Sequence, residues 1–107
     1  MRIIACDFDG TLCENKFPQI GAPNKEVIEK LIEEQKNGSK IILWTCRAEA
    51  QVLEAVKWCL EQGLVFDAVN DNLEHVKQYF GCNPRKIYAT EYWDDRAITI
   101  SIKNKLR

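Results

Sequence analysis

Short apolar runs alternate with stretches of helical periodicity along this chain, and that alternation limits the folds open to it. The apolar runs contain β-branched residues and cover residues 2–6, 40–45, 65–69 and 86–93. Runs of this kind are typical of strands buried on both faces. The stretches between them place apolar residues three and four apart and end near Gly38, Gly63 and Gly81, as helices do. This order predicts an α/β fold: a doubly wound, mostly parallel Rossmann-like sheet in three layers, with helices on both faces.

Two segments fall outside the alternation. Residues 8–23 contain two glycines and two prolines and are predicted to form a loop. Residues 97–103, AITISIK, alternate isoleucine with polar residues, which predicts a half-exposed edge strand. The chain has 107 residues and no linker or repeat, so we expect one domain over residues 1–107.

Composition narrows the partners and the compartment. The formal net charge is −1, which gives no electrostatic reason to expect a nucleic acid or an anionic membrane as partner. No segment is long enough to span a bilayer, and the N-terminal apolar run is too short for a signal peptide. The five cysteines include no CxxC pair, so the zinc-ribbon and thioredoxin signatures are absent. We expect a reduced, cytoplasmic protein with free thiols.

Residues with distinctive chemistry stand where the expected strands end. Asp7, Asp9, Gly10 and Thr11 follow the first run, Thr45-Cys46-Arg47 the second, and Asp94-Asp95 the fourth. Because ligands of such sheets bind beyond the carboxyl ends of the strands, these residues are expected to converge. Four carboxylates gathered there repel one another unless a cation compensates them. Oxygen ligands favour magnesium, and the predicted metal ligands are Asp7, Asp9, Asp94 and Asp95.

Plainer interpretations exist for each part of this pattern. Asp-x-Asp-Gly is also a common turn sequence, and Asp94-Asp95 taken alone is also typical of a helix N-cap. A calcium-binding EF-hand loop beginning at Asp7 is excluded, because its sixth position would be Leu12 and its twelfth Pro18. Taken jointly, the residues at three strand ends favour a functional site over an acidic turn.

The same residues can divide the steps of phosphoryl transfer among them. Asp7, at a strand terminus, is held rigidly enough to act as a nucleophile that forms an aspartyl phosphate. Asp9 is placed to protonate the leaving group and then to activate water. Thr45 offers a hydroxyl to the phosphoryl oxygens and Lys86 a positive charge. These four are the predicted catalytic residues, and the predicted substrate contacts are Gly10, Thr11, Thr45, Cys46, Arg47 and Lys86.

Four segments resemble, in order, the motifs of the haloacid dehalogenase-like (HAD) superfamily. Residues 7–11, DFDGT, are similar to its first motif, and residues 41–45, IILWT, to its second. Lys86 resembles the lysine of the third motif, with Arg85 beside it as an alternative. Residues 92–95, YWDD, resemble the fourth motif, the acidic pair after an apolar strand. The resemblance therefore extends over nearly the whole chain.

The resemblance implies a role for each matching residue. Asp7 would be the nucleophile and Asp9 the general acid/base, while Thr45 and Lys86 would hold the phosphoryl group. Magnesium would be bound by Asp7, by Asp94 and by the backbone carbonyl of Asp9, with Asp95 in support. Members that cleave carbon–halogen bonds lack an acid/base at the position of Asp9, so the resemblance implies phosphoryl chemistry.

The family usually covers its site with a cap domain, and no segment of this chain is long enough to form one. We therefore expect a capless phosphatase that hydrolyses phosphomonoesters with Mg²⁺ through an aspartyl phosphate on Asp7. Two alternatives stay open: a non-catalytic regulatory module that binds magnesium or phosphate, and a phosphotransferase. The expected partner is a small phosphorylated metabolite or a phosphorylated macromolecule, and an uncovered site also makes a second copy of the chain a candidate partner.

Overall fold

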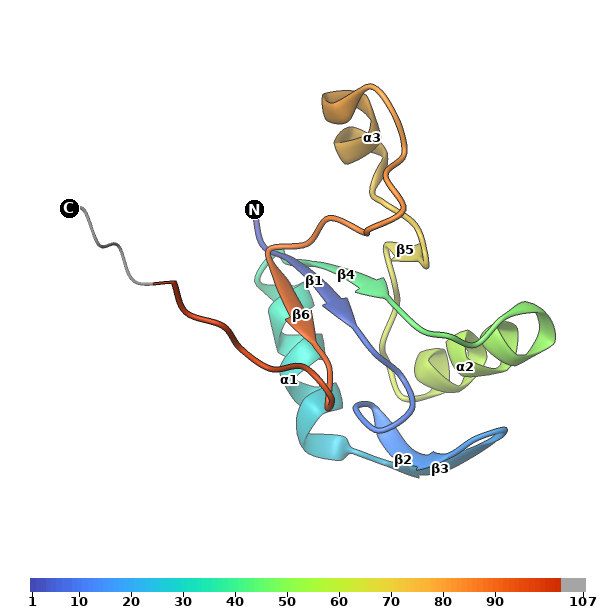
Figure 1. Ribbon diagram of the computed structural model, residues 1–107. Helices are drawn as coiled ribbons and strands as arrows, with labels where there is room; N and C mark the ends of the chain where they lie inside the picture. Colours follow the sequence, from blue (N-terminus) through green and yellow to red (C-terminus); the bar gives the residue numbers. More distant parts are fainter. Residues whose placement is uncertain (103–107) are drawn as a thin grey trace.

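A four-stranded parallel sheet lies at the centre of the molecule in the computed structural model, which describes residues 1–102 (Figure 1). Its order is β5 (Ala68–Val69), β4 (Lys40–Leu43), β1 (Ile3–Cys6) and β6 (Glu91–Trp93). In the register, Cys6 at the end of β1 is opposite Leu43 of β4 and Trp93 of β6. The three strands therefore end level with one another, and the residues that follow them meet at one edge.

Three helices cover the two faces of this sheet. They are α1 (Lys25–Lys36), α2 (Glu49–Glu61) and α3 (Glu74–Phe80), and each ends within two residues of a predicted glycine stop. Ile4 and Ile41 point to the face where α1 and α2 pack, whereas Ile3 and Ile42 point to the face that α3 covers. Because neighbouring strand residues face opposite sides, each strand is buried twice. The predicted three-layer α/β fold is confirmed.

An antiparallel hairpin replaces the loop predicted for residues 8–23. Its strands are β2 (Cys13–Lys16) and β3 (Gln19–Pro23), and Phe17 and Pro18 form the turn between them. Gly21 lies in β3 and is required for the pairing of the two strands, because an added Cβ there would collide with the carbonyl group of Glu14. Apart from this hairpin, the described residues form no second unit that could act as a cap.

The strands near the C-terminus are shorter than predicted. Residues 86–90 do not belong to β6, although Ile87 is buried, because the side chain of Asn72 accepts a hydrogen bond from the backbone N–H of Tyr88 (2.7 Å) and donates one to the carbonyl oxygen of Pro84 (2.9 Å). Residues 65–67 likewise precede β5.

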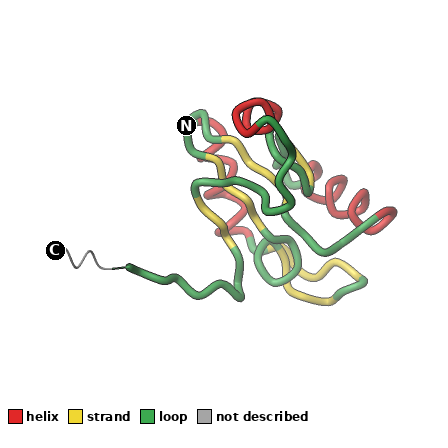
Figure 2. Tube along the Cα trace, turned by 45° about the horizontal axis from the view of Figure 1, so that its top comes forward, coloured by secondary structure: helices red, strands yellow, loops and turns green. Residues whose placement is uncertain are grey.

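The edge strand predicted for the tail is not formed in the described part of that segment. Residues 97–102 lead away from the sheet (Figure 2), and Ile98, Ile100 and Ile102 are exposed. The alternating pattern was wrong as a guide here because these isoleucines have no surface to pack against. The last residue of the predicted strand, position 103, lies outside the described residues. Within residues 1–102, no helix combines the length and the apolarity needed to cross a membrane.

Candidate active site

The residues that follow β1, β4 and β6 line one pocket of about 380 Å³ at the carboxyl edge of the sheet. The backbone N–H of Asp7 donates to the carbonyl oxygen of Trp93 (2.9 Å), and that of Trp44 donates to the carbonyl oxygen of Cys6 (2.9 Å), so the three strand ends are tied together. The lining residues come from the strand ends and the hairpin: Asp7, Asp9, Asn15, Phe17, Thr45, Cys46, Arg47, Asp94 and Arg96. The predicted convergence at this edge is therefore present.

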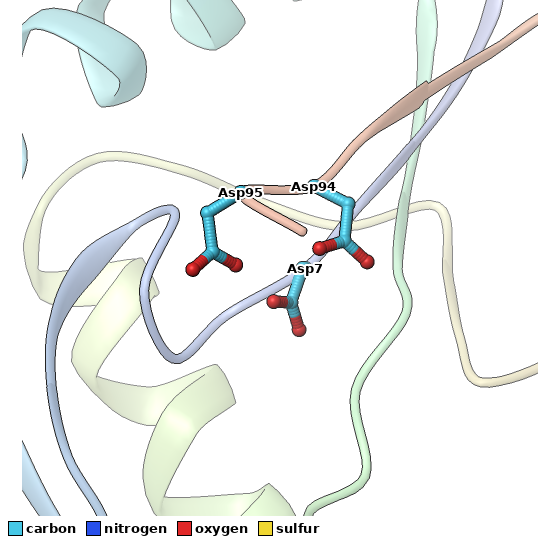
Figure 3. A group of neighbouring side chains, drawn as sticks. All are labelled: Asp7, Asp94 and Asp95. Carbon is cyan, nitrogen blue, oxygen red and sulfur yellow. The ribbon is translucent and has the colours of Figure 1, made fainter. Parts of the chain in front are cut away.

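Three carboxylates converge beside the pocket. Asp7, Asp94 and Asp95 each place an oxygen within 4.8 Å of the others (Figure 3). Burial and, to a smaller extent, the negative charges of Asp94, Asp95 and Asp9 together raise the pKa of Asp7 to about 6. Such a cluster is unfavourable as three bare anions, and a divalent cation would compensate it.

Gly10 and Thr11 support this cluster from behind and are not part of the pocket lining. Thr11 is buried, and its hydroxyl oxygen accepts a hydrogen bond from the backbone N–H of Asp95 (3.1 Å). Gly10 has a φ of +92°, and an added Cβ would lie 2.6 Å from a carboxylate oxygen of Asp95. A side chain at position 10 would thus displace Asp95. Both residues were predicted to contact substrate; in the structure Thr11 hydrogen-bonds Asp95, and Gly10 leaves room for the Asp95 carboxylate.

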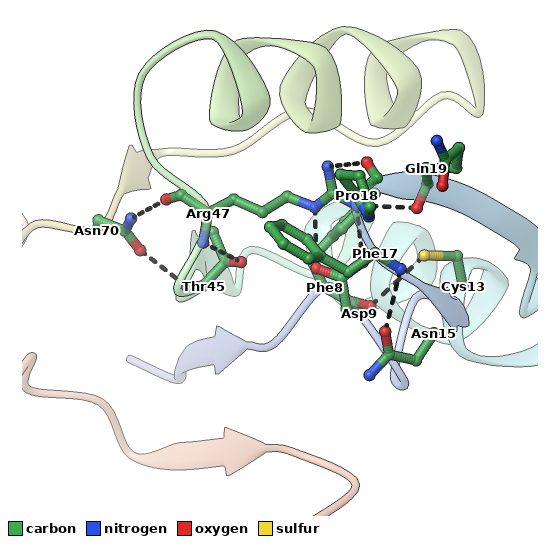
Figure 4. A network of polar contacts seen from close by, with 10 residues as sticks. All are labelled: Phe8, Asp9, Cys13, Asn15, Phe17, Pro18, Gln19, Thr45, Arg47 and Asn70. Atoms are coloured by element: carbon green, nitrogen blue, oxygen red, sulfur yellow. Dashed lines mark hydrogen bonds and ion pairs between the residues drawn. The ribbon is translucent and has the colours of Figure 1, made fainter.

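The Asp9 side chain is not part of the carboxylate cluster, and it faces Arg47 instead (Figure 4). Arg47 Nε donates to Asp9 Oδ2 at 2.8 Å, and Arg47 Nη2 donates to Asp9 Oδ1 at the same distance. The sequence predicted Asp9 among the metal ligands and Arg47 among the substrate contacts. The structure pairs their side chains with one another, and the side chain of Arg47 is fully buried.

Thr45 and Cys46, two of the predicted substrate contacts, line the pocket. The Thr45 hydroxyl oxygen accepts a hydrogen bond from the backbone N–H of Arg47 (3.1 Å), so its own proton is free to be donated into the pocket. The backbone N–H of Thr45 donates to the side-chain oxygen of Asn70 (2.8 Å). Asn70 was missed in the sequence, although it directly follows the third strand, where the strand-end rule would have pointed to it.

Lys86 is not brought to this pocket. Its ammonium group lies 5.7 Å from the centre of the Tyr92 ring, in a separate depression between α3 and β6. The cations in the lining of the active pocket are Arg47 and Arg96. Arg96 was missed as a site residue, and it is positioned by a hydrogen bond from its backbone N–H to Asp94 Oδ1 (2.9 Å). Its place directly after the acidic pair was the available signal.

The site thus combines a carboxylate that follows β1, an inner strand of the parallel sheet, with an acidic pair that follows the neighbouring strand β6. Residues 4–70 match the haloacid dehalogenase-like hydrolase family. The chain belongs to this family, so the resemblance found in the sequence is confirmed.

A solved structure supports the same assignment. The structure of the conserved protein coded by locus from Bacteroides thetaiotaomicron is similar, with a TM-score of 0.80 and 36% sequence identity. The match covers 91% of this chain and 78% of that one. No curated protein matches the chain.

Proposed function

We propose that this hydrolase cleaves phosphomonoesters with Mg²⁺ and that Asp7 carries the phosphoryl group between the two steps. The observation that carries the proposal is the position of Asp7: it directly follows β1, an inner strand of the sheet, lines the pocket, and lies beside two further carboxylates. A nucleophile has to be exposed to substrate and held still, and the backbone hydrogen bond to Trp93 restrains Asp7.

The side chains present fit magnesium. Asp7, Asp94 and Asp95 offer hard oxygen donors within 4.8 Å of one another, and Asp94 and Asp95 are exposed, which leaves room for the waters that Mg²⁺ retains. When bound, the ion would supply the positive charge that offsets these carboxylates and the phosphoryl oxygens. Arg96, in the same pocket, is the residue we assign to a further phosphoryl or substrate oxygen.

The residues would act in two steps. First, a carboxylate oxygen of Asp7 attacks phosphorus, the bond from phosphorus to the ester oxygen breaks, and Asp9 gives its proton to the departing oxygen. Second, Asp9 takes a proton from water, the water oxygen attacks the phosphorus of phospho-Asp7, and phosphate leaves with Asp7 regenerated. The Thr45 hydroxyl donates a hydrogen bond to a phosphoryl oxygen in both steps.

The pocket volume of about 380 Å³ favours a small phosphorylated metabolite as the substrate class. Phe17, from the turn of the β2–β3 hairpin, contributes an apolar wall next to polar groups from the strand ends. This is the mixture that small-molecule sites use to bind and orient a ligand.

The test is phosphate release from a panel of small phosphomonoesters with Mg²⁺ and with EDTA. The parent protein should turn over many times and only with the metal, and Asp7→Asn should be inactive. The matched control is Glu29→Gln, an exposed substitution of the same type on α1. Equal activity of Asp7→Asn and parent would refute the proposal, and stoichiometric phosphate binding without turnover would indicate a regulatory module instead.

A further inference from the structure

The side chain of Arg47 is fully buried, and all its hydrogen bonds go to Asp9 and to the β2–β3 hairpin. Besides the two bonds to Asp9, its Nη1 donates to the carbonyl oxygen of Pro18 and its Nη2 to that of Gln19, both at 3.1 Å. The acceptors belong to the turn of the β2–β3 hairpin and the start of β3 (Figure 4). One side chain therefore joins the Asp9 carboxylate to the hairpin.

Two aromatic rings hold the guanidinium group in place. Its central carbon lies 5.1 Å from the centre of the Phe8 ring and 5.0 Å from that of Phe17. Phe8 is buried next to Asp9, and Phe17 lies at the hairpin turn. A buried guanidinium is costly unless it is paired and hydrogen-bonded. Here the two hydrogen bonds to Asp9, the two backbone carbonyls and the two aromatic rings fulfil that condition. The Arg47 guanidinium group is thus held in place by hydrogen bonds within the protein, whereas a substrate-binding arginine keeps donors for the ligand.

We propose that Arg47 is a positioning residue that fixes the Asp9 carboxylate for proton transfer to the leaving group. The inference rests on the proposed function. A bidentate fork restrains both torsion angles of the aspartate side chain, because rotation about either breaks at least one of the two 2.8 Å bonds. Each carboxylate oxygen gives Arg47 one lone pair and keeps a second for a proton. Asp9 is therefore oriented without being blocked.

Substrates with different leaving groups separate this role from simple support of the fold. Expulsion of an alkoxide needs a proton from the general acid, whereas p-nitrophenolate leaves without one. The kcat/KM value reports only the steps up to the first irreversible one, here expulsion of the leaving group, and excludes hydrolysis of phospho-Asp7. We therefore compare kcat/KM for p-nitrophenyl phosphate with kcat/KM for glycerol phosphate, for parent, Asp9→Asn and Arg47→Ala.

Arg47→Ala is expected to lower kcat/KM about 100-fold for glycerol phosphate and only about tenfold for p-nitrophenyl phosphate. Small misplacements of catalytic groups have costs of this order. Asp9→Asn should show the same selective loss. Adding Arg47→Ala to Asp9→Asn should leave the ratio of the two substrates unchanged, because no acid remains to be positioned. Arg47→Lys, which keeps the charge and loses the fork, should fall between parent and Arg47→Ala.

Cys59→Ala is the control for loss of stability, because Cys59 is buried in the apolar core and does not line the pocket. Cys59→Ala should change kcat/KM for the two substrates by the same factor. If Arg47→Ala lowers kcat/KM equally for both substrates, or does not lower it at all, the inference is overturned. If the alanine variant does not fold, Arg47→Lys gives the same comparison. Inactive Asp7→Asn together with an unchanged substrate ratio in Arg47→Ala would refute the positioning role and leave the proposed function standing.

Discussion

Replacing Asp94 by Asn should stabilise the metal-free protein and weaken its response to Mg²⁺. The carboxylates of Asp7, Asp94 and Asp95 lie within 4.8 Å of one another. At that distance two unit charges repel by about 0.9 kcal/mol at the dielectric constant of water and by about 3.5 kcal/mol at an effective value of 20. Asp94 and Asp95 are exposed, so the lower end applies, and Asp94→Asn should remove about 1 kcal/mol of repulsion.

The pH for the comparison follows from the direction of the Asp7 shift. Its folded pKa of about 6 lies above its ordinary value, so folding favours the protonated form. The metal-free protein therefore loses stability from this group as the pH rises from about 4 through 6, and the full loss is present at pH 8. Asp94 is one of the charges that raise this pKa, so the gain from Asp94→Asn should be larger at pH 8 than at pH 4.

The assay is thermal unfolding at pH 8 in EDTA and in saturating Mg²⁺. In EDTA, Asp94→Asn should unfold about 4–8 °C above the parent, the shift that 1 kcal/mol produces in a domain of this size. In Mg²⁺ the order should reverse, because the parent gains more binding free energy. Glu29→Gln, which removes an exposed carboxylate of α1, should not change either value. An Asp94→Asn protein that is less stable in EDTA, and equally stabilised by Mg²⁺, would refute the reasoning.

Two further predictions concern the cation of the active pocket and the exposure of the cysteines. Arg96→Ala should lower kcat/KM for small phosphomonoesters by tenfold or more and by more than Lys86→Ala does, because Arg96 lines the active pocket and Lys86 lies against Tyr92; the reverse order would restore Lys86 to the site. Thiol labelling of the native protein at pH 8, read by peptide mass spectrometry, should modify the exposed Cys46 and Cys82 and spare Cys6, Cys13 and Cys59. Burial raises the pKa of Cys59 to about 12 and that of Cys6 further, so labelling of either without denaturant would contradict the packing described.

The sheet and the ends of its strands were predictable because their signals are local. Buried parallel strands are short apolar runs. Asp7 and Asp94 directly follow two of them, and Thr45 lies two residues after the end of a third. The register Cys6–Leu43 and Cys6–Trp93 then brings these residues together without any further information. The acidic cluster of the site was thus predictable from strand ends alone.

The parts that were missed depend on contacts between distant segments. Pro18 and Gly21 are turn residues, which favours a loop, yet in the hairpin a Cβ at position 21 would collide with the backbone of Glu14 on the partner strand. Once the hairpin forms, Arg47 is buried beneath it, so its interpretation as a substrate contact could not be corrected from the sequence. Lys86 was predicted to lie on the strand that leads to Asp94, but that strand begins only at Glu91. Lys86 therefore belongs to the segment before β6 and lies in a separate depression.

Phosphorylation of Asp7 during turnover is the step on which the proposed mechanism depends. The direct measurement is to quench the protein in acid during turnover of a small phosphomonoester with Mg²⁺, treat it with borohydride, and map the peptides by mass spectrometry. Borohydride reduces an aspartyl phosphate to homoserine, so we expect homoserine at position 7 and at no other aspartate position, and only when substrate is present. Turnover without homoserine at position 7, or with homoserine at another aspartate, would contradict it.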